Sequence, residues 1–124
     1  MNAADILNNL IAAVRTELGN GFNQISGFVQ TQGSLLAKEA AGIAQSRIDG
    51  DCKTDDDFYK WSLKRLADDT ANMARSVALM ALVTLEKAWN ALVNALWSGI
   101  RTILTGAGVP VGLLEALPGQ PAAN

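Results

Sequence analysis

The 124-residue sequence contains no histidine, one cysteine and three prolines, and only 6% of its residues are aromatic. Without histidine the chain lacks the commonest general base and metal ligand of proteins, and with it the Glu-x-x-His di-iron sites of helical bundles. The single cysteine, Cys52, cannot form an intrachain disulfide, which fits a reducing compartment better than a disulfide-rich secreted fold. We therefore expect no enzyme activity, no cofactor or metal, and no small-molecule substrate.

The charge balance and the N-terminal residues bear on partners and location. A net charge of −2 argues against nucleic acid as a partner, because that affinity depends on many phosphate-neutralising basic side chains. In the N-terminal stretch MNAADILNNLIAAVRTE, Asp5 precedes the apolar residues and Asn8 and Asn9 interrupt them, unlike a signal peptide. We expect the protein in the cytoplasm or within a larger particle.

Residues 3–48 carry a long helical pattern of apolar positions at steps of three and four. The pattern continues through Gly19-Asn20-Gly21 without a change of phase, which favours one helix from about residue 3 to residue 48. The alternative is that Gly19 ends one helix and Asn20 begins the next, which would give a compact four-helix bundle broken near residues 19–21. The positions in phase are Leu7, Ile11, Val14, Leu18, Phe22, Ile25, Val29, Gln32, Leu36, Ala40 and Ile43.

A polar turn over residues 49–54 separates this first half from a second helix. Thr54, with Asp57 three residues later, resembles a capping box, and three aspartates occupy the first helical turn, where the helix dipole favours negative charge. The helix is predicted over residues 55–104 and ends at the glycines 106 and 108. Two long helices and a short loop predict an antiparallel hairpin domain over residues 1–105. Residues 106–124 are predicted as an extended tail with one helical turn near residues 113–117.

Two polar clusters near residue 55 resemble functional motifs. Asp49, Asp51 and Asp55 match three calcium-loop positions, but Thr54 and Lys60 replace the glycine and the bidentate glutamate that such a loop requires. The aromatic and basic residues of FYKW, followed by Lys64 and Arg65, resemble contacts with nucleic acid or anionic lipid. Aspartates flank them, so a turn and an ordinary helix surface, including a Lys64–Asp68 pair, are the favoured interpretation.

The stretch VALMALVTLEKAWNALVNALWSGI, residues 77–100, is apolar enough to suggest a membrane span, with Trp89 and Trp97 as candidates for the membrane interface. Glu86 and Lys87 fall in its middle, and a charge at the bilayer centre costs roughly 2.5–3.5 kcal/mol, which disfavours a lone spanning helix. On a helical projection the polar side chains gather in one narrow arc and the rest is apolar. The arc contains Lys87, Asn90, Asn94, Ser98 and Arg101.

A two-helix rod cannot enclose this apolar surface, so we expect a homo-oligomeric helical bundle. The hairpin places residues 7–14 beside residues 90–97, and other copies cover the remaining sides. The predicted function is a non-enzymatic structural or assembly protein, such as a virion component. The alternative is a membrane-active or membrane-associated amphipathic protein. The residues predicted to face another copy or a membrane are Ala88, Trp89, Ala91, Leu92, Ala95, Leu96, Trp97, Gly99, Ile100 and Ile103.

Overall fold

The computed structural model describes residues 1–114 and 117–121, and within them the chain is 82% helical and has no strands. This confirms the predicted all-α helical bundle. The described elements, in chain order, are α1 (Ala3–Leu18), the 3-10 turn η1 (Gly19–Gly21), α2 (Phe22–Asp49), α3 (Asp56–Ala81), α4 (Leu85–Gly106) and the 3-10 turn η2 (Gly112–Leu114).

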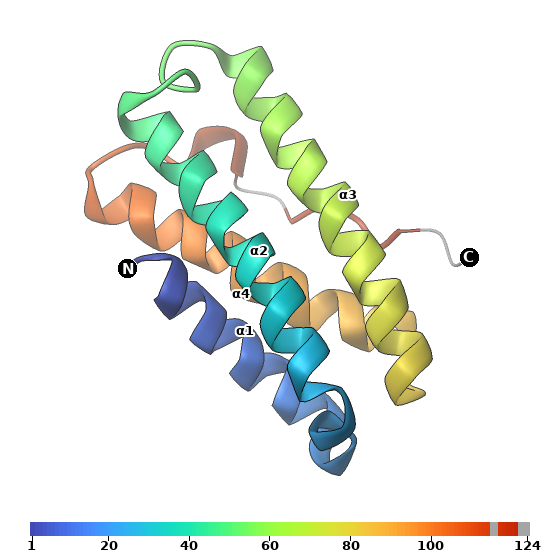
Figure 1. Cartoon of the computed structure of the whole chain (residues 1–124). Coiled ribbons are helices and arrows are strands. Elements are labelled where there is room, and N and C mark those ends of the chain that lie inside the picture. The colour runs from blue at the N-terminus through green and yellow to red at the C-terminus, as the bar shows by residue number, and fades with distance from the viewer. Residues whose placement is uncertain (115–116, 122–124) are drawn as a thin grey trace.

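The first half of the chain turns back on itself at η1. The backbone is helical without a gap from Ala3 to Asp49, but α1 lies antiparallel to α2 rather than in line with it (Figure 1). Gly19, at φ 56° and ψ −129°, adopts a conformation that glycine reaches more readily than any other residue, and it ends α1. The single straight helix over residues 3–48 is therefore wrong, and the alternative with a break near residues 19–21 is observed.

A second break, between α3 and α4, was not predicted. Leu82 has left-handed backbone angles, φ 57° and ψ 40°, and ends α3. Two residues later the Thr84 hydroxyl oxygen accepts a hydrogen bond from the Lys87 backbone N–H at 3.2 Å and caps α4. The predicted continuous helix over residues 55–104 is therefore wrong at residues 82–84, although its C-terminal end lies within two residues of the observed end at Gly106.

The Leu82→Gly substitution is expected to stabilise the protein. Left-handed angles cost a residue with a Cβ about 1–2 kcal/mol, and the Leu82 side chain is 89% exposed, so little packing is lost. Glycine gains entropy in the unfolded chain, which leaves a net increase of about 0.5–1 kcal/mol in the free energy of unfolding. Urea denaturation followed by circular dichroism measures the change, and a lower midpoint than wild type would contradict it.

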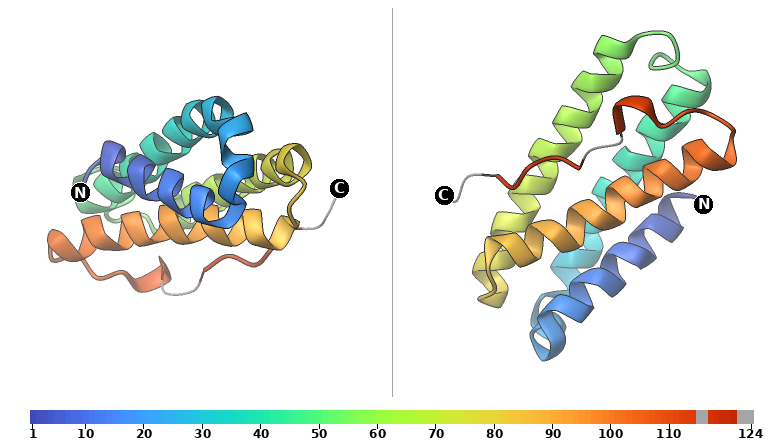
Figure 2. Two further views of the ribbon diagram at one scale, coloured as in Figure 1. Left: turned by 90° about the horizontal axis from the view of Figure 1, so that it is seen from below. Right: turned by 180° about the vertical axis from the view of Figure 1, so that it is seen from behind.

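The helices are arranged with α2 between α1 and α3, while α4 crosses behind them and packs against all three (Figures 1 and 2). This confirms that the N-terminal helix lies beside the apolar helix of residues 85–106. The C-terminal segment runs along the side of α4 that faces away from the other helices (Figure 2). Leu114 is fully buried there, and Arg101 donates a hydrogen bond to its carbonyl oxygen at 3.4 Å. The predicted turn at residues 113–117 overlaps η2 at residues 113 and 114, and residues 115 and 116 lie outside the described residues.

The N-cap of α3 lies one residue later than predicted. The Asp55 carboxylate, not Thr54, caps the helix by accepting a hydrogen bond from the Phe58 backbone N–H at 3.0 Å. Asp56 and Asp57 lie in the first turn, as predicted from the helix dipole. Aspartate is as good a cap as threonine, and its position next to two further carboxylates places all three at the positive end of the helix.

The buried side chains come from all four helices and form one core. In α2 the predicted positions Ile25, Val29 and Leu36 are buried, but Gln32 is exposed. In α1 Val14 is buried as predicted, but Ile6 and Leu10 are fully buried in place of the predicted Leu7 and Ile11, which are partly exposed. The turn at η1 lets α1 rotate independently of α2.

Candidate self-association surface

The ten residues predicted to face another copy or a membrane lie on α4. Ala95 and Ile103 are partly exposed, and the other eight are buried. Trp89 and Trp97 are each only 3% exposed. Because α4 packs against α1, α2 and α3 of its own chain, its apolar faces are covered from within the bundle. The excess apolar surface that motivated a self-association site on α4 is therefore not found there.

The small residues of α4 serve close packing against α1. A Cβ added to Gly99 would lie 2.6 Å from Cγ1 of Ile6, a residue that is itself fully buried. The helices approach so closely at this point that only glycine fits without displacing Ile6. The five polar residues predicted to share one arc are all exposed, which confirms that part of the projection. These are Lys87, Asn90, Asn94, Ser98 and Arg101.

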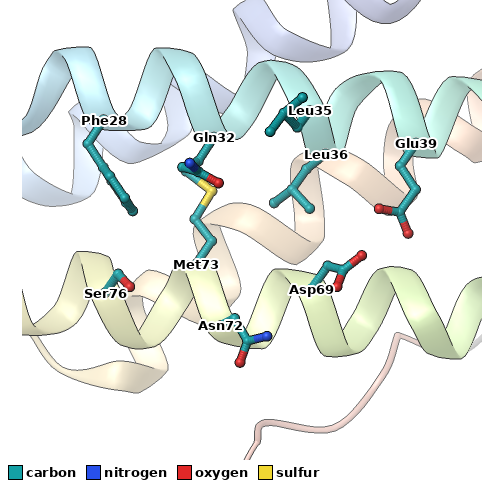
Figure 3. A pocket seen from close by; sticks show the side chains of 9 residues that line it. All are labelled: Phe28, Gln32, Leu35, Leu36, Glu39, Asp69, Asn72, Met73 and Ser76. Carbon is teal, nitrogen blue, oxygen red and sulfur yellow. The ribbon is translucent and has the colours of Figure 1, made fainter.

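A groove with a volume of about 530 Å³ lies between α2 and α3 (Figure 3). Phe28, Leu36 and Met73 give it an apolar lining, and the carboxyl groups of Glu39 and Asp69 face each other at one end. α2 and α3 therefore leave apolar side chains open to an approaching molecule, whereas α4 does not.

The Glu39 and Asp69 carboxyl groups lie close together across the groove, and this raises the pKa of Glu39. Burial, then the hydrogen bond to Asp69 and the negative charge of Asp69, raise the pKa of Glu39 from 4.5 to about 7, while the nearby Arg65 guanidinium acts in the opposite direction. Two carboxyl groups this close cannot both ionise at little cost. The Glu39 carboxyl group therefore keeps its proton up to about pH 7, its raised pKa, and is ionised above it.

The Glu39→Gln substitution is expected to flatten the dependence of stability on pH. Since the folded protein holds the Glu39 proton more tightly than the unfolded chain, the stabilisation is complete below about pH 4.5 and is lost as pH rises through about 7. Water enters the open groove, so we expect a loss of roughly 1–2 kcal/mol in the wild type, less than the full linkage value. Urea denaturation at pH 4.5 and pH 8 compares the proteins, and an unchanged pH slope in Glu39→Gln would contradict the raised pKa of Glu39.

Aromatic and basic side chains occupy the N-terminal half of α3. The rings of Phe58 and Trp61 stack with centroids 5.7 Å apart, and the Arg65 guanidinium lies 5.6 Å from the centre of the Trp61 ring. Trp61 is nevertheless 54% exposed. The predicted Lys64–Asp68 pair is confirmed as an ion pair of 3.1 Å on the helix surface. This end of α3 thus presents a tryptophan and an arginine to solvent, next to the groove.

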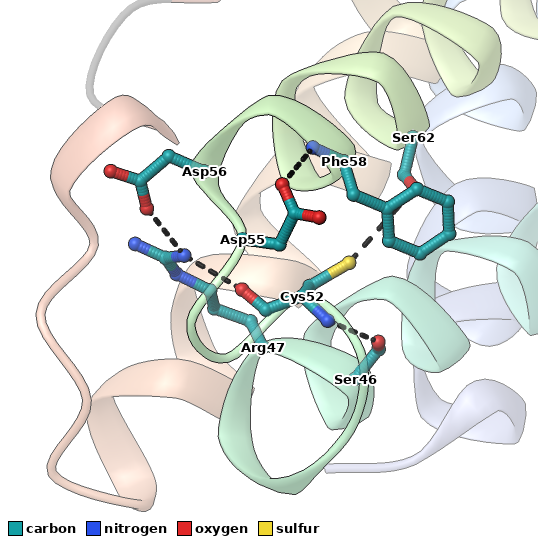
Figure 4. Close-up of polar contacts among 7 residues, drawn as sticks. All are labelled: Ser46, Arg47, Cys52, Asp55, Asp56, Phe58 and Ser62. Atoms are coloured by element: carbon teal, nitrogen blue, oxygen red, sulfur yellow. Dashed lines mark hydrogen bonds and ion pairs between the residues drawn. The ribbon is translucent and has the colours of Figure 1, made fainter.

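The loop between α2 and α3 is held by hydrogen bonds around Cys52 (Figure 4). The Cys52 backbone N–H donates to the Ser46 hydroxyl oxygen at 3.0 Å, and the Arg47 guanidinium donates to the Cys52 carbonyl at 2.7 Å and to Asp56 at 2.9 Å. The Cys52 side chain is buried and Sγ lies 4.0 Å from the Ser62 hydroxyl. These contacts use the polar groups of the loop to connect α2 to α3. In the described part of the chain no three His, Cys, Asp or Glu side chains are grouped to hold a metal.

The Tyr59→Phe substitution is expected to leave the protein as stable as wild type or more stable. Tyr59 is fully buried under the Arg47 guanidinium, 4.5 Å from its ring, and its hydroxyl has no hydrogen-bond partner among the described residues. An unpaired buried polar group costs about 1–3 kcal/mol, so removing it raises the free energy of unfolding by up to about 1 kcal/mol. Thermal denaturation measures this, and a clear loss of stability would show that the hydroxyl has a partner.

The exposed apolar residues of α2 and α3 were not predicted as a site. Leu36 is buried while its neighbour Leu35 is 57% exposed, because two successive residues of a helix point in different directions. Leu79 and Met80 near the end of α3 are 78% and 47% exposed. A helical projection of residues 77–100 treats them as one helix, whereas α3 ends at Ala81 and both residues lie in its last turn.

Comparisons with protein-family models, with curated proteins and with solved structures find no match to this chain. Over residues 1–114 and 117–121, no helix has both the length and the hydrophobicity that crossing a bilayer requires. Any assignment of function therefore depends on the surfaces described above.

Proposed function

We propose that this protein is a non-enzymatic structural subunit that associates with copies of itself in a larger assembly, such as a virion. One observation supports this most directly. Five of the nine large hydrophobic side chains that are exposed in the described part of the chain lie on α3 or on the residue that ends it. These five are Phe58, Trp61, Leu79, Met80 and Leu82.

The C-terminal end of α3 adds an energetic argument. Leu79 and Leu82 are 78% and 89% exposed, and Leu82 also has left-handed backbone angles that disfavour a residue with a Cβ. Neither side chain contributes much to the core of the single chain. Exposed apolar groups gathered on one element, one of them in a strained conformation, are typical of a surface that another protein covers.

Sedimentation equilibrium tests the proposal. The wild-type chain is expected to sediment at a multiple of 13.1 kDa at micromolar concentration. The double variant Trp61→Ser, Leu79→Ser is expected to sediment closer to the monomer mass, because it removes two exposed apolar side chains from α3. The control Leu113→Ser changes a side chain of similar exposure, 44%, on the C-terminal segment and is expected to associate like wild type. A wild-type monomer at high micromolar concentration would refute self-association.

The membrane-active alternative makes a different prediction for the same protein. Trp89 and Trp97 are buried, so α4 can contact lipid only if the bundle opens. Flotation with anionic vesicles, combined with tryptophan fluorescence, separates the two functions. A monomer that floats with vesicles and shows a blue-shifted emission would favour the membrane-active function over self-association.

A further inference from the structure

One row of α3 is arranged symmetrically about Ala67. Its members follow at steps of four, three, four, three and four residues, the spacing by which a helix presents one face to another helix. Arg65 and Asp69 are equally distant from Ala67, and the outer members are paired in the same way. Every member is exposed or partly exposed. The row consists of Phe58, Ser62, Arg65, Asp69, Asn72 and Ser76.

We propose that two copies of the chain pair through α3 in antiparallel orientation about a twofold axis at Ala67, with Arg65 of each copy against Asp69 of the other. This inference rests on the proposed self-association and names the surface that carries it. A twofold axis makes each contact occur twice, so one complementary charge pair on one helix becomes two across the interface. Ala67 marks only the level of the axis along α3, because its side chain, two residues from Arg65 and from Asp69, points to the opposite side of the helix from the row.

The charges of this face favour the antiparallel orientation. The basic residue Arg65 lies on the N-terminal side of Ala67, and Asp69 lies on the C-terminal side. A parallel pair in register would place like charges opposite each other at both positions. In the antiparallel pair the Arg65 guanidinium of each copy faces the Glu39–Asp69 carboxyl pair of the other. Opposite charges in facing positions fix register and orientation.

Trp61 lies at one edge of the same face. It is six residues from Ala67 and 54% exposed, and it lies beside the row rather than in it. In the antiparallel pair Trp61 of each copy lies at the level of Met73 of the other copy but on the opposite flank of the interface, where the second α3 covers its ring. Tryptophan and arginine are the side chains most enriched among strong contacts of interfaces.

Complementary charge reversals test the pairing. Arg65→Glu and Asp69→Lys, each alone, set like charges against each other at both symmetric positions, and we expect each to weaken self-association at least tenfold. Mixed in equal amounts, one copy of each restores both opposite-charge contacts, and the mixture is expected to associate like wild type. Sedimentation velocity of the two variants and their mixture gives the masses, and circular dichroism checks that each variant is folded.

Matched controls carry the same changes in charge elsewhere. Lys60→Glu lies on another side of α3, Glu17→Lys lies on α1, and both are expected to associate like wild type. Trp61→Ser tests the same surface of α3 without a change of charge, and it is expected to weaken self-association at least tenfold.

The outcomes separate this pairing from self-association in general. If wild type associates but Arg65→Glu, Asp69→Lys and Trp61→Ser associate equally well, the α3 pairing is overturned and the proposed function stands on another surface. If the charge variants dissociate and their mixture does not recover, the register about Ala67 is overturned. If wild type is a monomer, both proposals are overturned.

Discussion

Gly99→Leu is expected to lower the free energy of unfolding by about 3 kcal/mol or more. The first added carbon already lies 2.6 Å from Ile6, which is fully buried, and the rest of the leucine side chain would have to be accommodated between α1 and α4. Overpacking of a dense core typically costs 1–3 kcal/mol for a few extra methylenes, so a whole side chain lies at or above the upper end (~3 kcal/mol). Urea denaturation measures the loss.

Gly27→Leu is the matched control for this substitution. Gly27 also lies inside a helix, but a Cβ at this position meets no atom within 4 Å, and the residue is exposed. Replacing it is expected to stabilise α2 by up to about 1 kcal/mol, since leucine favours helix more than glycine does. If Gly99→Leu were as stable as Gly27→Leu, the close packing of α1 against α4 would be wrong.

Leu96→Ala is expected to lower the free energy of unfolding by about 2–5 kcal/mol. Leu96 is fully buried in the core, and truncation of such a leucine removes apolar burial and leaves a cavity. Because Leu96 is buried within one chain, the loss of stability is expected to be the same at low and high protein concentration. A residue buried between subunits would give a loss that depends on protein concentration.

Leu113→Ala provides the comparison for an exposed leucine. It is 44% exposed, and its truncation is expected to change stability by no more than about 0.5 kcal/mol. Chemical denaturation of both variants over a hundredfold range of protein concentration separates a core role from an interface role. If the loss of stability in Leu96→Ala disappears at high protein concentration, α4 lies at a subunit interface.

The fold determines which apolar surface is buried within the chain and which remains exposed. A hairpin of two long helices leaves α4 with more apolar surface than one neighbour can cover, and self-association through α4 follows from that geometry. The breaks at residues 19–21 and 82–84 let α1, α2 and α3 all pack on α4 of the same chain. The apolar surface that remains for other molecules then lies on α2 and α3, at Leu35, Trp61 and Leu79.

Structural features that depend on interactions between residues close in sequence could be predicted. The loop between α2 and α3, the aspartates at the start of α3 and the Lys64–Asp68 pair all follow from interactions within a few residues. The polar arc of α4 is equally local, since a helical projection depends only on spacing. The carboxyl pair of Glu39 and Asp69 could not be predicted, because thirty residues separate the two and only the packing of α2 on α3 brings them together.

The sequence by itself determined that the chain is all-helical, where α2 ends, and which side of α4 is polar. Tertiary structure alone decided whether the helices bend back at Gly19 and at Leu82, because neither residue forces a reversal and the energy that favours it comes from burying distant side chains. Ile6 against Gly99 is the clearest case. An apolar pattern in the sequence indicates which side chains are buried. It does not indicate which side chains they pack against, because burial against an apolar neighbour of the same chain or of another copy gains the same free energy.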